Sequence, residues 1–462
     1  MYMRQIISFL WIIPFLVFEN GYAQESMEKV LEEYVLIGIQ NNQALKQKNF
    51  SYQKSSAALK EARGMFMPSI SIEARYSRAG GGREIIFPVG DLMNPVYGSL
   101  NQLFAATGLP QQNFPTLENE QIPFLRKEEH ETKLRLVQPL IQPAIYYNYQ
   151  LKDNLSEASM SEVRAYKSQL ISEIKSAYYK YMQTIQLVTL FEGTLDLLNE
   201  NIRVSQALYD NDMVTIDVIY RAGSEKLKVD QQLEEAKHKN ILAKSYFNFL
   251  LNRPLDEDIL ISENNESPLY PVINLNTSEE RALKHRDEIR QIEHALSATE
   301  NAHALSGSGY FPNLNLVMDY GFQGAEYNFS KENDYWMASA VLSWNLFNGF
   351  QDNAKREQAA MDNKIMQARS NELRKQIRMQ VKNAVWGLQV SHKTLLSAQK
   401  QETQANESFK IVSTKYKEGV ASQIEFIDAR LNMTNSRINN IISKYDFFIK
   451  QAELDHVLGN SN

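Results

Sequence analysis

Histidines recur at a regular interval in the second half of the sequence. His285, His294 and His303 are each nine residues apart, and imidazole is a common metal ligand. Nine residues at about 100° per residue put successive side chains on opposite faces of a helix, which is the structure expected for this segment. The spacing therefore predicts no metal site here, and we expect neither a metal nor another cofactor.

Other patterns that support catalysis are also missing from the sequence. Gly80-Gly81-Gly82 precedes Arg83 but lacks the Walker spacing and the Lys-Ser/Thr pair of a phosphate-binding loop. The absence of cysteine excludes thiolate metal sites and a cysteine nucleophile. No Ser/His/Asp arrangement is recognisable, and no glycosidase-type acid pair can be picked out among 55 carboxylates. We expect that the protein is not an enzyme.

Charge and the N-terminal segment narrow the class further. Lys+Arg 49 against Asp+Glu 55 give a net charge of -6, so we expect no nucleic-acid partner. Arg4 precedes an apolar run from Ile6 to Phe18, and Gly21 and Ala23 are small residues suited to a cleavage site. Residues 1–23 therefore read as a signal peptide, and the apolar run is shorter than the ~20 residues of a membrane-spanning helix.

Two long stretches lack proline, the strongest helix breaker. One lies between Pro143 and Pro254, and the other follows Pro312. In the first stretch, apolar residues recur every three or four positions from Leu151 to Leu208. Both stretches are predicted to form very long helices with a narrow apolar stripe.

Each stretch is interrupted once by residues that favour a turn. In the later one, Gly419 suits the position after a helix end, and Ser422 with Glu425 forms a capping box. In the earlier one, Tyr209 precedes the turn and Thr215 is the expected N-cap of the next helix. Each stretch therefore predicts a helical hairpin.

Paired residues at constant intervals indicate an internal duplication. One interval separates Tyr209 from Tyr416, Ala177 from Ala384, and Leu251 from Leu458, and a larger one separates Leu45 from Ile289 and Pro68 from Pro312. We divide the chain into a first repeat (24–252), a linker (253–276) and a second repeat (277–462). Each repeat is predicted to hold a helix, a strand, a loop, a second strand and a helical hairpin.

Segments with alternating apolar and polar residues predict four strands. They include Ile70 to Tyr76, Lys133 to Leu136, Leu314 to Phe322 and Trp336 to Leu346. At about ten residues each, they have the length of tilted membrane-spanning strands. Soluble hairpins packed on helices are the alternative. Residues 79–129, rich in glycine and proline, are predicted to be a long irregular extracellular loop between the first two strands.

Aromatic residues near the ends of these segments fit the membrane interpretation. Tyr76, Tyr320, Trp336 and Trp344 are the residues that we expect in an interfacial girdle. Four strands cannot close a barrel, and an open edge in lipid leaves backbone groups unpaired. Several chains must therefore contribute, and the pattern by itself allows two or three.

The export signal, the duplication and the order of elements resemble the TolC family of outer-membrane efflux proteins over essentially the whole mature chain. The turn that carries the resemblance reads Tyr416, Gly419, Ser422, Glu425, Asp428 and Ala429. The resemblance implies a mainly α fold with β, in which long antiparallel hairpins form a trimeric α-barrel. It also implies that four strands per chain join one 12-stranded transmembrane β-barrel.

The resemblance implies a location and partners too. The homotrimer would lie in outer-membrane lipid, extend into the periplasm, and bind a periplasmic adaptor and an inner-membrane RND or ABC pump. It would then be the exit duct of a tripartite efflux or type I secretion system, for small molecules or polypeptides. The alternative is a periplasmic coiled-coil adaptor, against which the strands before each hairpin argue.

The family's periplasmic gate can be placed on this sequence residue by residue. Glu425 and Asp428 match acidic positions that face the axis, and Tyr416 and Asp217 match positions that link neighbouring hairpins. A basic residue that joins this link in some members corresponds to Ala421 here, so closure would be looser or carried by residues such as Lys417. The alternative for Glu425 and Asp428 is that they only cap and stabilise their helix.

Overall fold

The computed structural model describes residues 27–108, 110, 114–261, 270–271 and 273–460. The predicted signal peptide lies outside these residues. The chain divides into two compact units. Unit 1 comprises Met1–Tyr52, Ala158–Ile292 and Arg369–Asn462, and unit 2 comprises Gln53–Glu157 and Glu293–Ala368.

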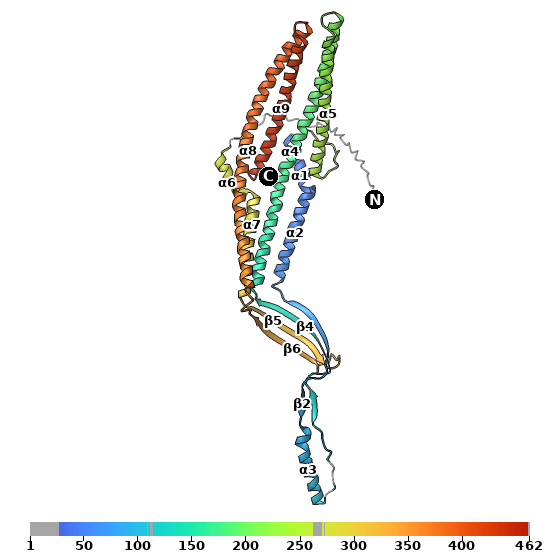
Figure 1. Cartoon of the computed structure of the whole chain (residues 1–462), viewed down its shortest axis with the longest axis vertical. Coiled ribbons are helices and arrows are strands. Elements are labelled where there is room, and N and C mark those ends of the chain that lie inside the picture. Colours follow the sequence, from blue (N-terminus) through green and yellow to red (C-terminus); the bar gives the residue numbers. More distant parts are fainter. Residues whose placement is uncertain (1–26, 109, 111–113, 262–269, 272, 461–462) are drawn as a thin grey trace, which may run out of the picture. The chain divides into compact units, whose positions relative to one another are not determined.

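Apart from β2, α3 and β3 in the first half and a 3-10 turn in the second, the two halves of the chain have the same order of elements (Figure 1). The first half contains α1 (Met27–Asn41), α2 (Gln43–Gly64), β1 (Ser69–Arg78), β2 (Glu84–Phe87), α3 (Val89–Thr107), β3 (Glu120–Pro123), β4 (Glu128–Ile141), α4 (Pro143–Asp210) and α5 (Asp217–Leu251). The second half contains α6 (Leu275–His285), α7 (Asp287–Ser306), the 3-10 turn η1 (Ser308–Tyr310), β5 (Asn313–Gly324), β6 (Asp334–Ser343), α8 (Gln351–Lys417) and α9 (Gln423–Val457). The predicted repeat boundaries themselves stay predictions.

The long helices are confirmed. Helices α4 and α8 have 68 and 67 residues, and α5 and α9 have 35 each. Pro143 opens α4, a position where its missing N–H costs nothing. Within the described part of the chain, no helix is both long and apolar enough to cross a membrane.

Unit 1 has an apolar core on the predicted helical stripe. Leu170, Ile174 and Tyr178 follow one another along α4 at intervals of four and are fully buried. They pack with residues of α1 and α5, and a second cluster joins α6, α8 and α9. This spacing puts the side chains on one face of the helix, so burial follows directly from the sequence pattern.

Unit 2 contains an antiparallel sheet with the order β1-β4-β5-β6. These are the four strands predicted from the alternating segments. The described sheet is open, with β1 and β6 at its edges. Its two outer strands therefore present unpaired backbone groups along one side each.

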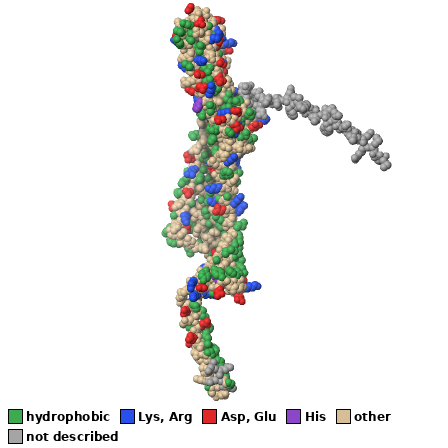
Figure 2. Space-filling model, turned by 90° about the vertical axis from the view of Figure 1, so that its right-hand side faces the viewer, with side chains coloured by type: hydrophobic (Ala, Val, Ile, Leu, Met, Phe, Trp, Pro, Cys, Tyr) green, Lys and Arg blue, Asp and Glu red, His purple; other side chains and the backbone are tan. Residues whose placement is uncertain are grey.

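The two faces of the sheet differ sharply in polarity. One face carries Ile70, Ile72, Ala74 and Tyr76 of β1, Leu134 and Leu136 of β4, Leu316, Met318, Tyr320 and Phe322 of β5, and Trp336, Ala338, Ala340 and Leu342 of β6. Ile72 and Trp336 each keep 77% of their surface exposed, and Figure 2 shows hydrophobic side chains gathered over the sheet. The apolar face is therefore the exposed face, the reverse of a soluble sheet.

The opposite face holds ion pairs. Arg135 on β4 lies 2.8 Å from both carboxylate oxygens of Asp319 on β5, and 3.2 Å from Glu73 on β1. The Tyr335 hydroxyl donates to Glu131 at 2.6 Å. These contacts join all four strands through their polar side chains, because side chains of neighbouring strands stand opposite one another.

The prediction that residues 79–129 are irregular was wrong. They contain the short hairpin of β2 and β3 and the 19-residue helix α3. Pro95 lies inside α3, where a proline ordinarily disfavours a helix. The count of glycines and prolines misled the prediction because it did not weigh the helical spacing of the apolar residues between them. We call residues 79–127 the arm.

The close approach of β4 and β5 at Gly321 generates a prediction about stability. A Cβ atom on Gly321 would lie 2.5 Å from the Thr132 carbonyl oxygen and 2.6 Å from Lys133 Cβ. Gly321→Ala should therefore destabilise the fold by about 1–3 kcal/mol, because the strands must separate. Thermal unfolding followed by circular dichroism measures the effect.

The matched control is Gly193→Ala in α4, where nothing lies within 4 Å of the added atom. It should stabilise the chain by roughly 0.5–1 kcal/mol, because alanine favours a helix more than glycine. If Gly321→Ala unfolded at the same temperature as the parent, the tight pairing of β4 and β5 would be contradicted.

Candidate functional site

The turn between α8 and α9 is built as the sequence predicted. Gly419 follows α8 with a φ of 72°, a left-handed conformation that suits glycine. The Ser422 amide and hydroxyl both donate to Glu425 Oε2, at 2.7 and 2.9 Å, and the Glu425 amide donates to Ser422 Oγ at 3.3 Å. The capping box is therefore confirmed.

Two carboxylates lie in the first turns of α9. Glu425 and Asp428 are both exposed, and their spacing of three puts them on one side of the helix. The hydrogen bonds from the amide and the hydroxyl of Ser422 hold the pKa of Glu425 below its ordinary value. Glu425 therefore stays ionised at neutral pH while it caps the helix, so the capping role and a negative surface coexist.

The turn between α4 and α5 corrects one prediction. Thr215 is not the N-cap: Ile216 occupies that position without a side-chain hydrogen bond. Thr215 Oγ1 donates to the Asp217 carboxylate instead, and Arg221 lies 3.3 Å from the same group. The Thr215 hydroxyl is directed at the Asp217 side chain, a local contact that a list of favoured N-cap residues does not weigh. The Thr215 bond, supported by the charge of Arg221, lowers the pKa of Asp217.

The end of α4 closes the same turn. Tyr209 has a partly exposed side chain, and its carbonyl oxygen accepts from the Asp212 amide at 2.9 Å. Asp212 has a φ of 56° and so adopts the left-handed conformation that Gly419 adopts in the other turn. The two turns are neighbours, since a Cβ on Gly419 would lie 2.9 Å from Met213 Cε.

Tyr416 joins the two hairpins from a buried position. Its ring packs on Phe426 with the centroids 4.9 Å apart, and a hydrogen bond of 2.9 Å joins its hydroxyl to Ser205 Oγ on α4. Ala421 packs against the same apolar cluster. Within one chain, Tyr416 and Asp217 are therefore held by different partners.

The sequence analysis missed two further contacts between the hairpins. Arg430 Nη2 on α9 lies 2.7 Å from Glu225 Oε2 on α5, and both residues are buried. Gln423 donates to Asn201 Oδ1 at 3.1 Å. Burial lowers the pKa of Arg430, although Glu225 opposes the shift. The signal for the ion pair was a charged residue inside each apolar stripe. Arg430 lies between Phe426 and Met433, which are buried, and Glu225 lies between Ala222 and Val229, which are also buried.

The aromatic residues predicted for a membrane interface lie on or beside the exposed apolar face of the sheet. Tyr320 pairs directly with Trp336 across β5 and β6. Tyr76 stacks on Tyr327 with the centroids 6.2 Å apart, and the Trp344 indole N–H donates to the Tyr310 carbonyl at 3.2 Å. All four are more than half exposed, as an interfacial position requires of such side chains.

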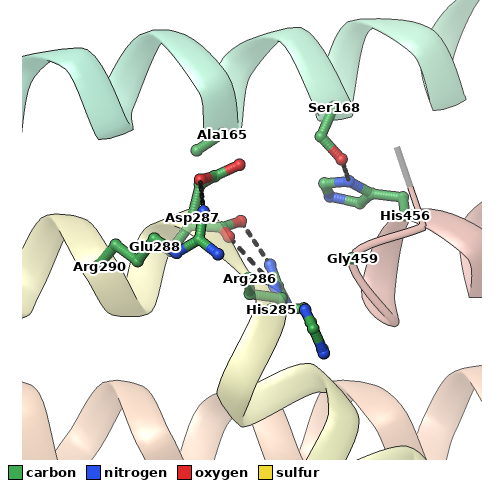
Figure 3. Close-up of a pocket in the computed structure, with 9 residues that line it drawn as sticks. All are labelled: Ala165, Ser168, His285, Arg286, Asp287, Glu288, Arg290, His456 and Gly459. Atoms are coloured by element: carbon green, nitrogen blue, oxygen red, sulfur yellow. Dashed lines mark hydrogen bonds and ion pairs between the residues drawn. The ribbon is translucent and has the colours of Figure 1, made fainter. Parts of the chain in front are cut away.

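A cavity of about 210 Å³ lies in unit 1, away from the hairpin turns (Figure 3). Its lining residues are Ala165, Ser168, His285, Arg286, Asp287, Glu288, Arg290, His456 and Gly459. Arg286 binds Glu288 at 2.6 Å and Arg290 binds Asp287 at 3.2 Å, so its charges are paired. Among the described residues, no group of three or more His, Cys, Asp or Glu side chains is arranged to hold a metal ion.

His456 closes this cavity by attaching the end of α9 to α4. Its Nδ1 and Ser168 Oγ are joined by a hydrogen bond of 2.9 Å. Burial, reinforced by the charge of Arg286, lowers the pKa of His456, and Glu288 only partly opposes this shift. The cavity is small and polar, unlike most ligand pockets, so we assign it a structural role.

The lowered pKa of His456 predicts how stability depends on pH. Below the unfolded-state pKa of about 6.5, the unfolded chain binds a proton at this residue more readily than the folded chain. Stability should therefore fall as the pH falls below about 6.5 and towards the lower folded pKa. In His456→Gln the decrease in thermal midpoint between pH 7.5 and 5.5 should be smaller than in the parent. An equal decrease in both proteins would show that His456 does not contribute.

Known proteins resemble this chain in sequence over its second half and in structure over nearly its whole length. Residues 279–460 match the family model of the outer membrane efflux protein. The outer-membrane channel OprN is 15% identical with a TM-score of 0.78, covering 94% of this chain and 90% of that chain. The CmeC outer membrane channel of Campylobacter jejuni is 15% identical with a TM-score of 0.75, covering 93% and 86%. VceC of Vibrio cholerae is 14% identical with a TM-score of 0.74, covering 93% and 96%.

At these identities the likeness to solved structures establishes the fold, and the family match adds the relationship by sequence. No curated protein matches the sequence. The matched segment includes α8, α9 and the turn with the capping box. By this match, residues 279–460 are similar to the outer membrane efflux protein family, and nearly the whole chain shares the fold of the OprN, CmeC and VceC proteins.

Proposed function

We propose that the protein is the outer-membrane exit duct of a tripartite efflux or type I secretion system. The observation that carries this proposal is the polarity of the sheet, whose apolar face is exposed and whose opposite face holds ion pairs. An apolar outer surface and a polar interior are what a strand needs when lipid lies on one side and an aqueous channel on the other. Tyr76, Tyr320, Trp336 and Trp344 would then lie at the lipid interface.

The open edges of the sheet support a homotrimer. In lipid, the free backbone groups of β1 and β6 must find partners, since no water is available to them. Pairing β6 of one chain with β1 of the next satisfies both edges, and three chains give a 12-stranded barrel. The same threefold arrangement places the hairpins of α4, α5, α8 and α9 side by side as an α-barrel in the periplasm.

The partners follow from this arrangement. A duct with a periplasmic α-barrel must receive its cargo from an inner-membrane pump, of the RND or ABC class, through a periplasmic adaptor. The alternative, that the chain is itself a soluble adaptor, is disfavoured by the exposed apolar sheet. A soluble protein would cover a patch of this extent.

The hairpin turns are the proposed periplasmic gate. In a trimer, Glu425 and Asp428 would contribute six carboxylates near the narrow end, which favours cations. Three side-chain contacts hold the two hairpins of one chain together: Tyr416 with Ser205, Gln423 with Asn201, and Arg430 with Glu225. Asp217 and Lys417 lie beside the turns and are available for contacts between chains.

The native mass of the mature protein tests the trimer. We expect it to be extracted from the membrane fraction only with detergent, and to have three times the chain mass after correction for bound detergent. The physical reason is that the free edges of the sheet need partners. A soluble monomer recovered from the periplasm would contradict the proposal and favour the adaptor.

The acidic gate is tested by conductance in planar bilayers. Glu425→Gln with Asp428→Asn removes the charges but keeps the cap, because a capping box accepts Glu or Gln. We expect the cation-over-anion permeability ratio to fall at least about twofold, since the ring attracts cations electrostatically. Glu407→Gln, an exposed residue of α8 away from the turn, should leave the ratio unchanged. An unchanged ratio in the double variant would remove the acidic-gate hypothesis.

A further inference from the structure

Helix α3 of the arm carries a heptad-like seam. The seam consists of Leu92, Val96, Ser99, Leu103 and Ala106. The alternating steps of four and three residues are those of a helix that packs along another helix. Ser99 and Ala106 are small, so they allow close approach of a partner.

Within the part of the chain that the structure describes, this seam is uncovered. Leu92, Val96 and Leu103 keep 64%, 49% and 60% of their surface exposed, and Figure 2 shows hydrophobic side chains along the arm. Asp91 is the only charged residue in α3. A helix of this length with an uncovered apolar stripe and almost no charge is marginal in water, so a partner for the stripe is expected.

Polar contacts on the other side of α3 fix the direction of the seam. The Asn94 side chain pairs with both backbone groups of Leu117, at 2.9 and 2.8 Å. Asn119 bonds to Asp91 through its amide at 2.9 Å and accepts from the Asp91 backbone N–H at 3.1 Å. A Cβ on Gly90 would lie 2.5 Å from the Leu117 carbonyl oxygen, so this approach is tight.

Aromatic packing holds the same side. Phe114 stacks on Tyr97, with the centroids 5.0 Å apart, and contacts Phe104 at 6.4 Å. Segment 114–119 therefore occupies the face of α3 opposite the seam. The helix cannot turn its seam towards its own chain without breaking these contacts.

The arm is attached to the sheet at both ends. It follows the last residue of β1, Arg78, and ends before the first residue of β4, Glu128. These two residues are paired partners in the sheet. In the proposed trimer, three arms would therefore rise from the same end of one barrel. This tether gives each seam a high effective concentration of the other two.

We propose that the three α3 helices of the trimer pack against one another in parallel, along the seam, around the threefold axis. The inference rests on the trimer of the proposed function and goes beyond it by assigning the partner of the arm. The occupant of each seam is a second copy of the same helix. Such a bundle would narrow the opening of the proposed barrel on the side from which the arms leave the sheet.

The test uses the absence of cysteine from the chain. Leu103→Cys places one thiol on the seam, and Gln102→Cys places a matched, exposed thiol one residue away and about 100° around the helix. Full-length variants are oxidised in the membrane with copper phenanthroline and separated on non-reducing gels. The native mass in detergent is measured on the same samples.

We expect Leu103→Cys to form covalent dimers at least about ten times more than Gln102→Cys, since a disulfide needs Cβ atoms roughly 4 Å apart. Only a parallel arrangement brings residue 96 and residue 103 of one copy each next to the same residue of another copy. Val96→Cys should behave like Leu103→Cys, which guards against a local effect of one substitution.

Each other outcome overturns the inference. A trimer without a crosslink at Leu103→Cys would leave the proposed duct intact but show that the arms do not meet. Equal crosslinking of both variants would indicate random collision. A covalent product with a different protein would assign the seam to a foreign partner. Failure to find a trimer would remove the proposed function itself, and the arm bundle with it.

Discussion

An antiparallel sheet whose apolar side chains lie on its exposed face is the constraint on which the rest of this chain depends. In water such a face would be covered by a core, but here Ile72 and Trp336 remain open while Arg135 and Asp319 pair on the other side. The sheet therefore needs an apolar medium on one face, and its outer strands β1 and β6 need further strands. In the proposed function, lipid meets the first need and neighbouring copies of the chain meet the second.

The helical hairpins solve a different problem. Each hairpin buries an apolar stripe, as Leu170 and Ile174 do in α4, and this burial supplies stability without specifying how hairpins align. Alignment is carried by polar contacts near the turns, above all the buried pair of Glu225 and Arg430. Both charges of a buried ion pair have lost their hydration, so a shift that separates them leaves each charge buried without a partner and costs free energy. The pair therefore favours the one alignment of the two hairpins in which the charges meet.

Several features of fold and site could be predicted from local patterns. The long helices follow from the absence of proline after Pro143, and the capping box from Ser422 and Glu425 three residues apart. Other features could not. Ile216 occupies the N-cap position expected for Thr215, whose hydroxyl is directed at the Asp217 side chain. Helix α3 was not predicted, because the glycine and proline content of the segment outweighed the helical spacing of its apolar residues. The Glu225–Arg430 contact joins residues far apart in sequence, so no local pattern identifies the pair.

The sequence by itself determined the type and approximate length of the main elements, because periodicity, proline and capping residues act within a few residues of one another. It also determined which residues lie on the apolar side of each element. Only the tertiary structure decided which face of the sheet is exposed, which buried charges pair, and towards which side the seam of α3 turns. Those outcomes depend on contacts between distant segments, such as Asn94 with Leu117, and the energy of such a contact exists only once the chain has brought both residues together.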